Sequence, residues 1–489
     1  MSTPQAQPAT PRFANYINGE WATSSKTFES RNPANTDEVI GVFSKGTAAD
    51  MEAATQAAEA ALPGWASMPA PARGNILYKA ADILEKKFDQ LGAEMTREEG
   101  KTLPEAKGEV RRAINIFRYF AGEGSRLDGV MVPSERERVH VFAIRKPIGV
   151  VGLVTPWNFP IAIPAWKMAP ALICGNTIVV KPASVAPLSA WRLVEALHEA
   201  GAPKGVVNFV AGSGGELGAA LVNAKALKAI SFTGSNEIGH WIHQEASKRR
   251  LRIQLEMGGK NPTIVLADAD LKSAVENVVN ASFFSTGQKC TATSRAIVED
   301  AIYNRFLEAL VERTKSLKVG DGMKPGIEIG PCVDEGQMNT VLKYIEIGRK
   351  ESGEPKCGGK RLTGDAYDKG YFVEPTVFAD VKPEHTIARE EIFGPVLAVM
   401  RAKDFEDAMR IANDTPFGLS SSIQTTNLSK MFDYVYRAEA GLLTINLPSA
   451  GVEYQLPFGG TKDSSFGPKE QGPAALDFYS DYKTVYVKY

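Results

Sequence analysis

Gly149-Val-Val-Gly-Leu-Val154 is a short apolar run that ends directly in the polar, proline-containing segment Thr155-Pro-Trp-Asn-Phe-Pro160. Three similar runs follow at intervals filled with helix-like sequence: Thr177 to Val180, Val206 to Val210 and Ala229 to Phe232. This alternation is typical of parallel βαβ units, and it predicts an α/β fold. Because ligands of open parallel sheets bind outside the carboxyl ends of the strands, the residues that follow each run are candidate site residues.

The residues at these strand ends are polar or small. Lys181-Pro-Ala-Ser184 follows the second run, and Thr233-Gly-Ser235 follows the fourth, just before an expected helix whose free N–H groups suit a phosphate. Glu256 lies near the end of a further run, Leu251 to Met257, shortly before two glycines. A turn of this composition is common after any single strand, but several in one sheet predict a ligand site.

Helical periodicity elsewhere in the first half predicts three surface-packed helices, at residues 48–62, 71–99 and 103–124. A second α/β lobe is expected from Pro262 onward. Its predicted elements are strands at Thr263 to Leu266 and Ala296 to Val298 and a helix from Ala301 to about Leu317.

Two strand-like segments are set apart from both lobes. Met131 to Ile148 interrupts the first lobe with alternating apolar and polar residues, and Thr484 to Val487 lies near the end of the chain. Together they predict a small separate sheet for subunit contacts. A homo-oligomer, either a dimer or a tetramer, is therefore expected.

The composition is that of a folded globular protein with balanced charge. Among 489 residues 44% are hydrophobic, and 56 Lys plus Arg stand against 57 Asp plus Glu, which gives a formal net charge of -1. No charge excess would attract nucleic acid or an anionic membrane. The polar start lacks the pattern of a secretory signal, and the apolar region Pro160 to Val180 is interrupted by Lys167 and two prolines, so a cytoplasmic protein without a membrane span is expected.

The four cysteines are widely spaced without a C-x-x-C pair, which argues against a zinc site or a disulfide framework, and no metal is expected. Cys290, in Gly287-Gln-Lys-Cys-Thr-Ala-Thr-Ser-Arg295, is the candidate nucleophile, because Lys289 and an expected helix start after it would favour a thiolate. Cys174 lies in apolar sequence and is expected to be buried, while Cys357 stays as an alternative. A cysteine hydrolase is the rival enzyme class, but it normally needs a histidine, and none lies near Cys290 in the sequence.

Seven ordered blocks of the sequence resemble the signature blocks of the aldehyde dehydrogenase superfamily. They are Thr155 to Pro160, Lys181-Pro-Ala-Ser184, Phe232-Thr-Gly-Ser235, Leu255-Glu-Met-Gly-Gly259, Gly287-Gln-Lys-Cys290, Glu391-Ile-Phe-Gly-Pro395 and Pro457-Phe-Gly-Gly460. The resemblance spans nearly the whole chain. It implies a two-lobed α/β fold with a Rossmann-type cofactor domain, an α/β catalytic domain and a small β oligomerisation element. The implied bounds are 1–130 and 149–258 for the NAD(P)-binding domain, 259–460 for the catalytic domain, and 131–148 with 476–489 for the oligomerisation element.

The resemblance also implies a mechanism. NAD(P)-dependent oxidation of an aldehyde to a carboxylic acid would run through a thiohemiacetal and a thioester on Cys290, with the oxyanion held by Asn158 and by the Cys290 main-chain N–H. Glu256 would be the general base for the water that cleaves the thioester. A cofactor-binding or structural relative without turnover, the alternative from another class, would have lost one of these three residues.

The resemblance further implies a set of binding residues. The cofactor contacts are Thr155, Pro156, Trp157, Lys181, Ser184, Gly214, Gly218, Phe232, Gly234, Ser235, Glu256, Glu391 and Phe393. The candidate substrate contacts are Phe159, Lys289, Ser294, Phe458 and Glu470, the last as a second carboxylate on the water path.

Two departures from the family pattern bear on specificity. Ser184 stands where a Glu is common, and the loss of that carboxylate favours NADP, with NAD as the alternative and Lys181 as the cation for a 2′-phosphate. Trp166 and Phe284 stand where succinic semialdehyde dehydrogenases carry arginines, which argues against that substrate.

Within the superfamily, Gly287 to Arg295 and Gly451 to Phe458 are most similar to the 2-oxoglutarate semialdehyde (2,5-dioxopentanoate) dehydrogenases of bacterial sugar-acid breakdown. The resemblance implies that small aldehyde as substrate, with succinate or glutarate semialdehyde and broad-range aliphatic aldehydes as alternatives. A substrate carboxylate would need a cation or several N–H or hydroxyl donors, and the candidates are Lys289, Ser294, Arg295 and Lys167.

Overall fold

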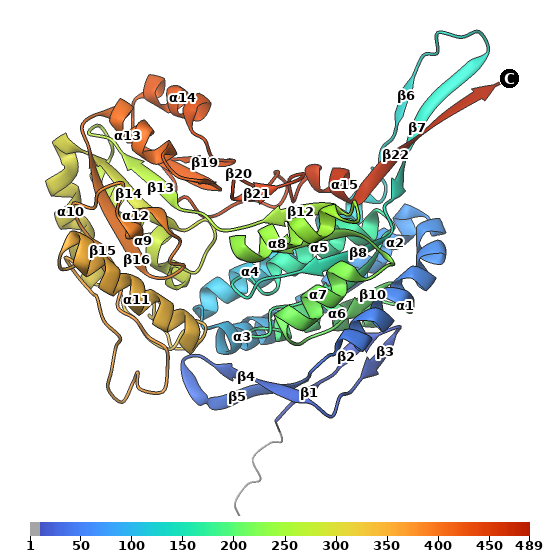
Figure 1. The fold of residues 1–489 in the computed structure, drawn as a ribbon, viewed down its shortest axis with the longest axis horizontal. Coiled ribbons are helices and arrows are strands. Elements are labelled where there is room, and N and C mark those ends of the chain that lie inside the picture. Colours follow the sequence, from blue (N-terminus) through green and yellow to red (C-terminus); the bar gives the residue numbers. More distant parts are fainter. Residues whose placement is uncertain (1–9) are drawn as a thin grey trace, which may run out of the picture.

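An eight-stranded sheet forms the centre of the first lobe of this computed structural model, which describes residues 10–489 (Figure 1). The strand order is β21-β12-β11-β8-β9-β10-β2-β3, and the five strands from β12 to β10 run parallel. The bounds are β2 (Asn15–Ile17), β3 (Glu20–Ala22), β8 (Val150–Val154), β9 (Thr177–Lys181), β10 (Val207–Phe209), β11 (Leu227–Thr233), β12 (Arg252–Glu256) and β21 (Ser465–Phe466). The α/β fold predicted from the apolar runs is confirmed.

Eight helices surround this sheet: α1 (Ala48–Ser67), α2 (Ala70–Lys86), α3 (Phe88–Glu99), α4 (Leu103–Glu123), α5 (Ala162–Ile173), α6 (Leu188–Glu199), α7 (Gly214–Asn223) and α8 (Asn236–Ser247). The single helix predicted at 71–99 is wrong, because the backbone leaves the helical region at Lys87 (φ -96°, ψ 11°). The Lys87 Nζ donates to Glu195 and Glu199 of α6, a tertiary contact that local periodicity does not reveal. The helix α4 has one fully buried face, with Ile114, Phe117 and Phe120, and one partly exposed face.

A six-stranded parallel sheet forms the second lobe, in the order β15-β16-β14-β13-β18-β19. Its strands are β13 (Asn261–Val265), β14 (Thr293–Glu299), β15 (Thr376–Phe378), β16 (Val396–Ala402), β18 (Ser420–Gln424) and β19 (Leu442–Ile445). Its helices are α9 (Leu271–Phe283), the short 3-10 helix η1 (Phe284–Gly287), α10 (Asp300–Lys315), α11 (Glu335–Ser352), α12 (Thr386–Arg389), α13 (Phe405–Asn413) and α14 (Leu428–Arg437). The chain enters this lobe after Glu256 and returns through β21, which pairs antiparallel with β12.

Smaller elements complete the fold. Strands β1 (Arg12–Phe13), β4 (Thr27–Asn32) and β5 (Asn35–Ser44) form one three-stranded sheet, and β17 (Phe417–Gly418) pairs with β20 (Thr461–Lys462). A second three-stranded sheet, β22-β7-β6, projects from the first lobe (Figure 1). It consists of β6 (Val130–Val132), β7 (Val139–Pro147) and β22 (Ser480–Lys488), which follows α15 (Ala474–Tyr479). The two segments set apart in the sequence therefore pair with each other, as predicted.

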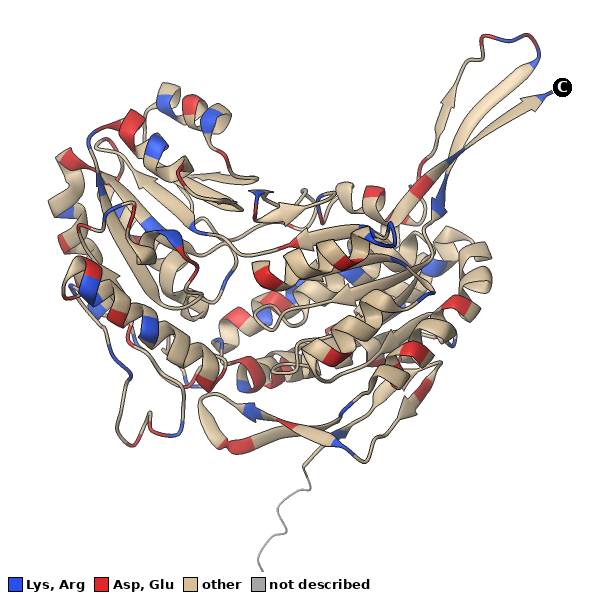
Figure 2. Cartoon of the chain, viewed as in Figure 1, with Lys and Arg blue, Asp and Glu red and all other residues tan. Residues whose placement is uncertain are grey.

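Charged residues of both signs are interspersed over the two lobes (Figure 2). In residues 10–489, no helix has both the length and the apolar character that a membrane crossing requires. The same residues contain no group of three or more His, Cys, Asp or Glu that could hold a metal ion.

Candidate active site

Cys290 lies in the loop between η1 and β14, next to the point where the chain crosses between the lobes. Two residues before it, Ser285 and Thr286, have left-handed backbone conformations (φ 54° and 58°). Such conformations are strained in residues other than glycine, so the surrounding structure must hold this loop in place. Asn261, the first residue of β13, donates from Nδ2 to the carbonyls of Cys290 (2.7 Å) and Ala292 (2.9 Å). The helix expected directly after Cys290 is wrong, because the chain makes a turn there and enters β14.

The electrostatic surroundings of Cys290 favour a thiol. Burial raises the pKa of Cys290 to about 12, and the carboxylates of Glu391 and Glu256 raise it further, against main-chain N–H groups that lower it. Lys289 and the Cys290 thiolate attract each other, but the Lys289 Nζ donates to the carbonyl of Asn280 (3.1 Å) and burial lowers the pKa of Lys289 to about 8. A thiolate stabilised by Lys289 therefore stays a prediction.

A cavity of about 270 Å³ lies beside Cys290 and is lined in part by residues from two of the strand ends singled out in the sequence. It is lined by Pro156, Trp157, Asn158, Thr233, Gly234, Ser235, Met257, Gly258, Cys290, Gln337, Thr340, Glu391, Ile392 and Phe393. The alternative cysteine, Cys357, and also Cys174 and Cys332, lie inside hydrophobic clusters instead. Cys290 is thus the cysteine with access to a ligand.

Asn158 is buried beside the nucleophile loop. One N–H of its Nδ2 donates to the carbonyl of Gln288 at 3.0 Å, and the second has no partner among residues 10–489. An amide N–H fixed in this way beside a nucleophilic sulfur is the donor that a developing oxyanion needs.

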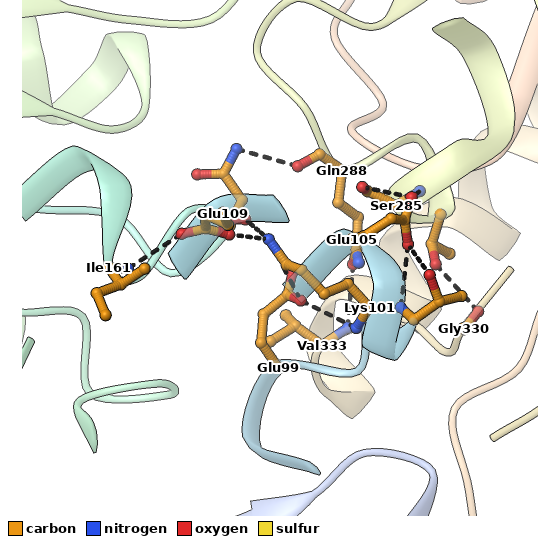
Figure 3. A network of polar contacts seen from close by, with 12 residues as sticks. Glu99, Lys101, Glu105, Glu109, Ile161, Ser285, Gln288, Gly330 and Val333 are labelled. Carbon is orange, nitrogen blue, oxygen red and sulfur yellow. Dashed lines mark hydrogen bonds and ion pairs between the residues drawn. The ribbon is translucent and has the colours of Figure 1, made fainter. Parts of the chain in front are cut away.

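A buried polar network supports Asn158, and Figure 3 shows its members Glu99, Lys101 and Glu109. The Nζ of Lys101 donates to the Asn158 carbonyl (2.7 Å) and pairs with Glu109 at 2.5 Å. The other oxygen of Glu109 accepts the main-chain N–H groups of Ile161 and Ala162, both at 3.1 Å. The network therefore ties α4 to both ends of the Asn158 turn.

The same helix also holds the nucleophile loop. Glu105 Oε1 accepts the main-chain N–H (2.8 Å) and the hydroxyl (3.0 Å) of Ser285 (Figure 3). Gln288 in turn accepts the N–H of Val333 at 3.0 Å through its Oε1. Sequence reasoning missed these residues, although Glu105 and Glu109, four residues apart and so on one face of the helix, were an available signal.

Glu256 ends β12 and is buried near the sulfur of Cys290. Burial raises its pKa well above the ordinary value, and the charge of Glu470 adds to this. The hydroxyl of Ser465 donates to its Oε2, and this bond, together with the charges of Lys469 and Lys167, opposes the shift. A buried carboxyl group whose pKa is raised above its ordinary value is suited to general acid–base work.

The structure places the predicted substrate contacts in different surroundings. Glu470 is paired with Lys167 and accepts the Trp166 Nε1–H at 2.7 Å, while Phe458 packs on Trp166 with ring centroids 5.4 Å apart. The ring of Phe159 lies under Lys101 Nζ, at 4.4 Å.

Other predicted contacts do not line the Cys290 cavity. Lys289 and Ser294 line a separate cavity of about 20 Å³. All the hydrogen bonds of Arg295 go to main-chain carbonyls, those of Lys260, Ile411 and Ala412. Arg295 and Lys167 are therefore unsuited as partners of a substrate carboxylate, because both are already committed.

The predicted cofactor residues lie along one edge of the first sheet. The hydroxyls of Thr155 and Thr233, at the ends of β8 and β11, are buried and have no partner among residues 10–489. A side chain at Gly234 would meet the ring of Phe232 at 2.5 Å, whereas Gly214 and Gly218 have open space around them. Unpaired hydroxyls and accessible glycines fit the phosphates and hydroxyls of a dinucleotide.

Two further groups border this edge. Glu391 accepts the N–H of Gly259 (2.9 Å), and burial raises its pKa to about 7. Phe393 lies edge-on to Trp157, with ring centroids 5.4 Å apart. At the end of β9, burial lowers the pKa of Lys181 to about 8, and the Ser184 hydroxyl donates to the Gly212 carbonyl at 2.6 Å.

Comparison with known proteins identifies the family. The sequence model of the aldehyde dehydrogenase family matches residues 21–485. The chain belongs to the aldehyde dehydrogenase family. It is 48% identical to an alpha-ketoglutaric semialdehyde dehydrogenase of Bacillus subtilis over 97% of this chain and 98% of that protein. It is 43% identical to a 2,5-dioxopentanoate dehydrogenase of Saccharolobus solfataricus over 93% of this chain and 95% of that protein.

A solved structure gives the same answer for the fold. Betaine aldehyde dehydrogenase of Staphylococcus aureus in complex with NAD+ superposes with a TM-score of 0.94 at 34% identity, covering 97% of this chain and 95% of that chain. This aldehyde dehydrogenase is thus an oxidoreductase that acts on a small aldehyde, and the polar strand ends described above fit a nicotinamide cofactor. The fold and family implied by the seven sequence blocks are confirmed.

Proposed function

We propose that this aldehyde dehydrogenase oxidises 2-oxoglutarate semialdehyde (2,5-dioxopentanoate) to 2-oxoglutarate, with Cys290 as nucleophile. The observation that carries the proposal is the similarity, over nearly the whole chain, to two relatives named for this substrate. Asn158 and Cys290 line one cavity, and Glu256 lies within electrostatic reach of the Cys290 sulfur, which supports the chemistry.

Cys290 starts the reaction by losing its thiol proton and attacking the aldehyde carbon. Because burial raises the pKa of this thiol to about 12, its proton must pass to solvent water as the sulfur attacks the bound aldehyde. The oxyanion that develops accepts hydrogen bonds from the second amide N–H of Asn158 and from the main-chain N–H of Cys290. Glu256 later takes a proton from the water that attacks the thioester, which releases the acid and restores the thiol.

The strand ends of the first sheet hold the cofactor in this proposal. When bound, the nicotinamide supplies the acceptor for the hydride that leaves the aldehyde carbon. The proposed contacts are those named from the sequence: Thr155, Pro156, Trp157, Lys181, Ser184, Gly214, Gly218, Phe232, Gly234, Ser235, Glu256, Glu391 and Phe393. NADP is the favoured cofactor, because no carboxylate occupies position 184 to repel a 2′-phosphate.

The projecting sheet is the proposed oligomerisation element, within the domain bounds expected from the sequence. Met131 is 74% exposed and Tyr486 is 63% exposed, which is unusual for large apolar side chains gathered on one small sheet. A homo-oligomer, dimer or tetramer, would cover them. Light scattering of the wild type and of Met131→Lys tests this part, since a charge on the covered face would weaken assembly.

A rate panel tests the substrate. The purified enzyme is given 2-oxoglutarate, glutarate and succinate semialdehydes and pentanal, each with NAD and with NADP, and cofactor reduction is followed. We expect the highest kcat/KM for 2-oxoglutarate semialdehyde and measurable turnover with NADP. A higher kcat/KM for pentanal would overturn the proposed substrate while leaving the family assignment intact.

A further inference from the structure

The guanidinium of Arg112, on α4, has unused hydrogen-bond donors close to the nucleophile. Its Nε is buried and has no partner among residues 10–489. One Nη2 bond reaches Gln471 Oε1 at 3.3 Å, which is long for a charged donor. Burial lowers the pKa of Arg112, opposed by the charges of Glu109, Cys290 and Glu453, so the guanidinium lies within electrostatic reach of the reactive sulfur.

The partner of this arginine offers a second unused donor. Gln471 is fully buried, and its Nε2 also has no partner in the described part of the chain. Its backbone is left-handed (φ 59°), and the neighbouring Glu470 exchanges two main-chain hydrogen bonds with Phe458, both at 2.7 Å. The Gln471 amide is therefore held in place by its surroundings. Unsatisfied buried donors are costly, and two on adjacent side chains indicate a missing acceptor.

The walls beside these donors suit a short carbon chain. The Arg112 guanidinium lies 5.6 Å from the centroid of the Trp166 ring, and Phe458 packs on the same ring. Trp166 is fixed by its hydrogen bond to Glu470. A ligand here would meet aromatic surface along its carbon chain and donors at its charged end.

Other cations nearby are already committed. Lys167 is paired with Glu470, Lys101 with Glu109, and the donors of Arg295 go to main-chain carbonyls. The exposed carboxylate of Glu453 acts on Arg112 electrostatically but forms no ion pair with it. Lys260 Nζ also has no partner in the described part of the chain, but Lys260 lines a separate cavity that does not include Cys290. Arg112 is therefore the buried cation whose open donors fit a ligand of Cys290.

We propose that Arg112 and Gln471 bind the carboxylate of the substrate and so select aldehydes that carry a carboxylate at the far end of the chain. The planar guanidinium and the amide N–H together present donors to two carboxylate oxygens, while the aldehyde end faces Cys290. The proposal rests on the proposed function, because it takes Cys290 as the reacting group.

Glutarate semialdehyde and pentanal test the assignment, since they share a five-carbon chain and differ in the carboxylate. In Arg112→Met we expect kcat/KM for glutarate and 2-oxoglutarate semialdehydes to fall about 10- to 100-fold, mainly through KM, because a hydrogen-bonded charge pair is lost. Turnover of pentanal should stay within about threefold of wild type. Gln471→Met should shift the same ratio in the same direction by a smaller factor.

Arg111→Met is the matched control, because Arg111 is the next residue on α4 but pairs with Glu85 at the surface. It should leave the ratio of the two substrates unchanged. An equal loss for both aldehydes in Arg112→Met would mean a structural role and would overturn the proposal, as would an unchanged preference for the carboxylated aldehyde. A wild type with no preference for carboxylated aldehydes would instead overturn the proposed substrate, and with it this inference.

Discussion

Lys101 donates a hydrogen bond of 2.7 Å from its buried Nζ to the main-chain carbonyl of Asn158. The same ammonium pairs with Glu109 and lies 3.8 Å from Glu99, and the exposed fractions of all three side chains are 3% or less. The turn that carries the oxyanion donor is thus fixed by a charged group inside the protein. Removing that charge would leave two carboxylates buried without a cation.

Lys101→Met should therefore lower both stability and turnover. We expect a loss of about 3 to 5 kcal/mol in the free energy of unfolding, because breaking a buried ion pair strands its partners. The kcat should fall at least about tenfold through misplacement of the Asn158 amide. Urea denaturation and steady-state kinetics measure the two effects. Lys107→Met, which removes an exposed pair with Asp89, should cost less than about 1 kcal/mol, and similar losses in both variants would contradict the role of Lys101.

The difference between what the sequence predicted and what it missed follows from the range of the interactions. Strands such as β8 and β11 were predictable because alternating helices and apolar runs are local patterns. The contact between Lys101 and Asn158 joins residues 57 positions apart, and that between Arg112 and Gln471 joins residues 359 apart. Such contacts exist only in the folded chain.

The electrostatic surroundings of Cys290 could not be predicted from the sequence for the same reason. A neighbouring lysine in the sequence favours a thiolate, but the fold turns the Lys289 ammonium toward Asn280 and brings the Glu391 carboxylate near the sulfur. The candidate residues themselves could be named, because the family blocks carry them. Their electrostatic surroundings depend on the folded chain and could not be predicted from these blocks.

Cys290→Ala should abolish aldehyde oxidation and leave cofactor binding nearly unchanged, because the sulfur forms the covalent intermediate and is not a cofactor anchor. Stopped-flow turnover and a fluorescence titration with NADPH measure the two properties. Cys357→Ala, which alters a buried cysteine in the core of the second lobe, should retain activity. Residual turnover of Cys290→Ala within about tenfold of wild type would exclude Cys290 as the nucleophile.

Glu256→Gln should slow deacylation more than acylation. A neutral amide cannot take a proton from the attacking water, so reduced cofactor should appear in a burst followed by a slow steady state. Rapid-quench or stopped-flow measurements separate the two phases. If the rates of the burst and of the steady state fell by the same factor, the base for deacylation would have to be another group.

The activity should rise with pH through the elevated pKa of Glu256, since its ionised form is the base. Burial is the main cause of that elevation, with Glu470 next and Ser465, Lys469 and Lys167 opposing it. Glu470→Gln removes a negative charge and leaves Lys167 unpaired, and both changes lower the pKa of Glu256. The acidic limb of the kcat profile should therefore move to lower pH, while the control Glu453→Gln leaves it in place. A limb that stayed fixed or moved upward in Glu470→Gln would show that Glu256 does not control it.

Ser184→Glu should raise the ratio of NAD to NADP in kcat/KM by about one to two orders of magnitude, because a like-charge contact with a 2′-phosphate costs on the order of 1 to 3 kcal/mol at a partly screened site. In the wild type, the Ser184 hydroxyl donates to the Gly212 carbonyl and the nearby Lys181 ammonium donates to the Pro182 carbonyl. Neither group carries a negative charge, so neither repels a phosphate. Ser184→Gln is the matched control, since it has the size of Glu without the charge and should change the ratio much less. Steady-state kinetics with both cofactors measure the effect. A wild type that strongly prefers NAD, or a ratio equally changed by Glu and Gln, would mean that residue 184 does not face the adenosine ribose.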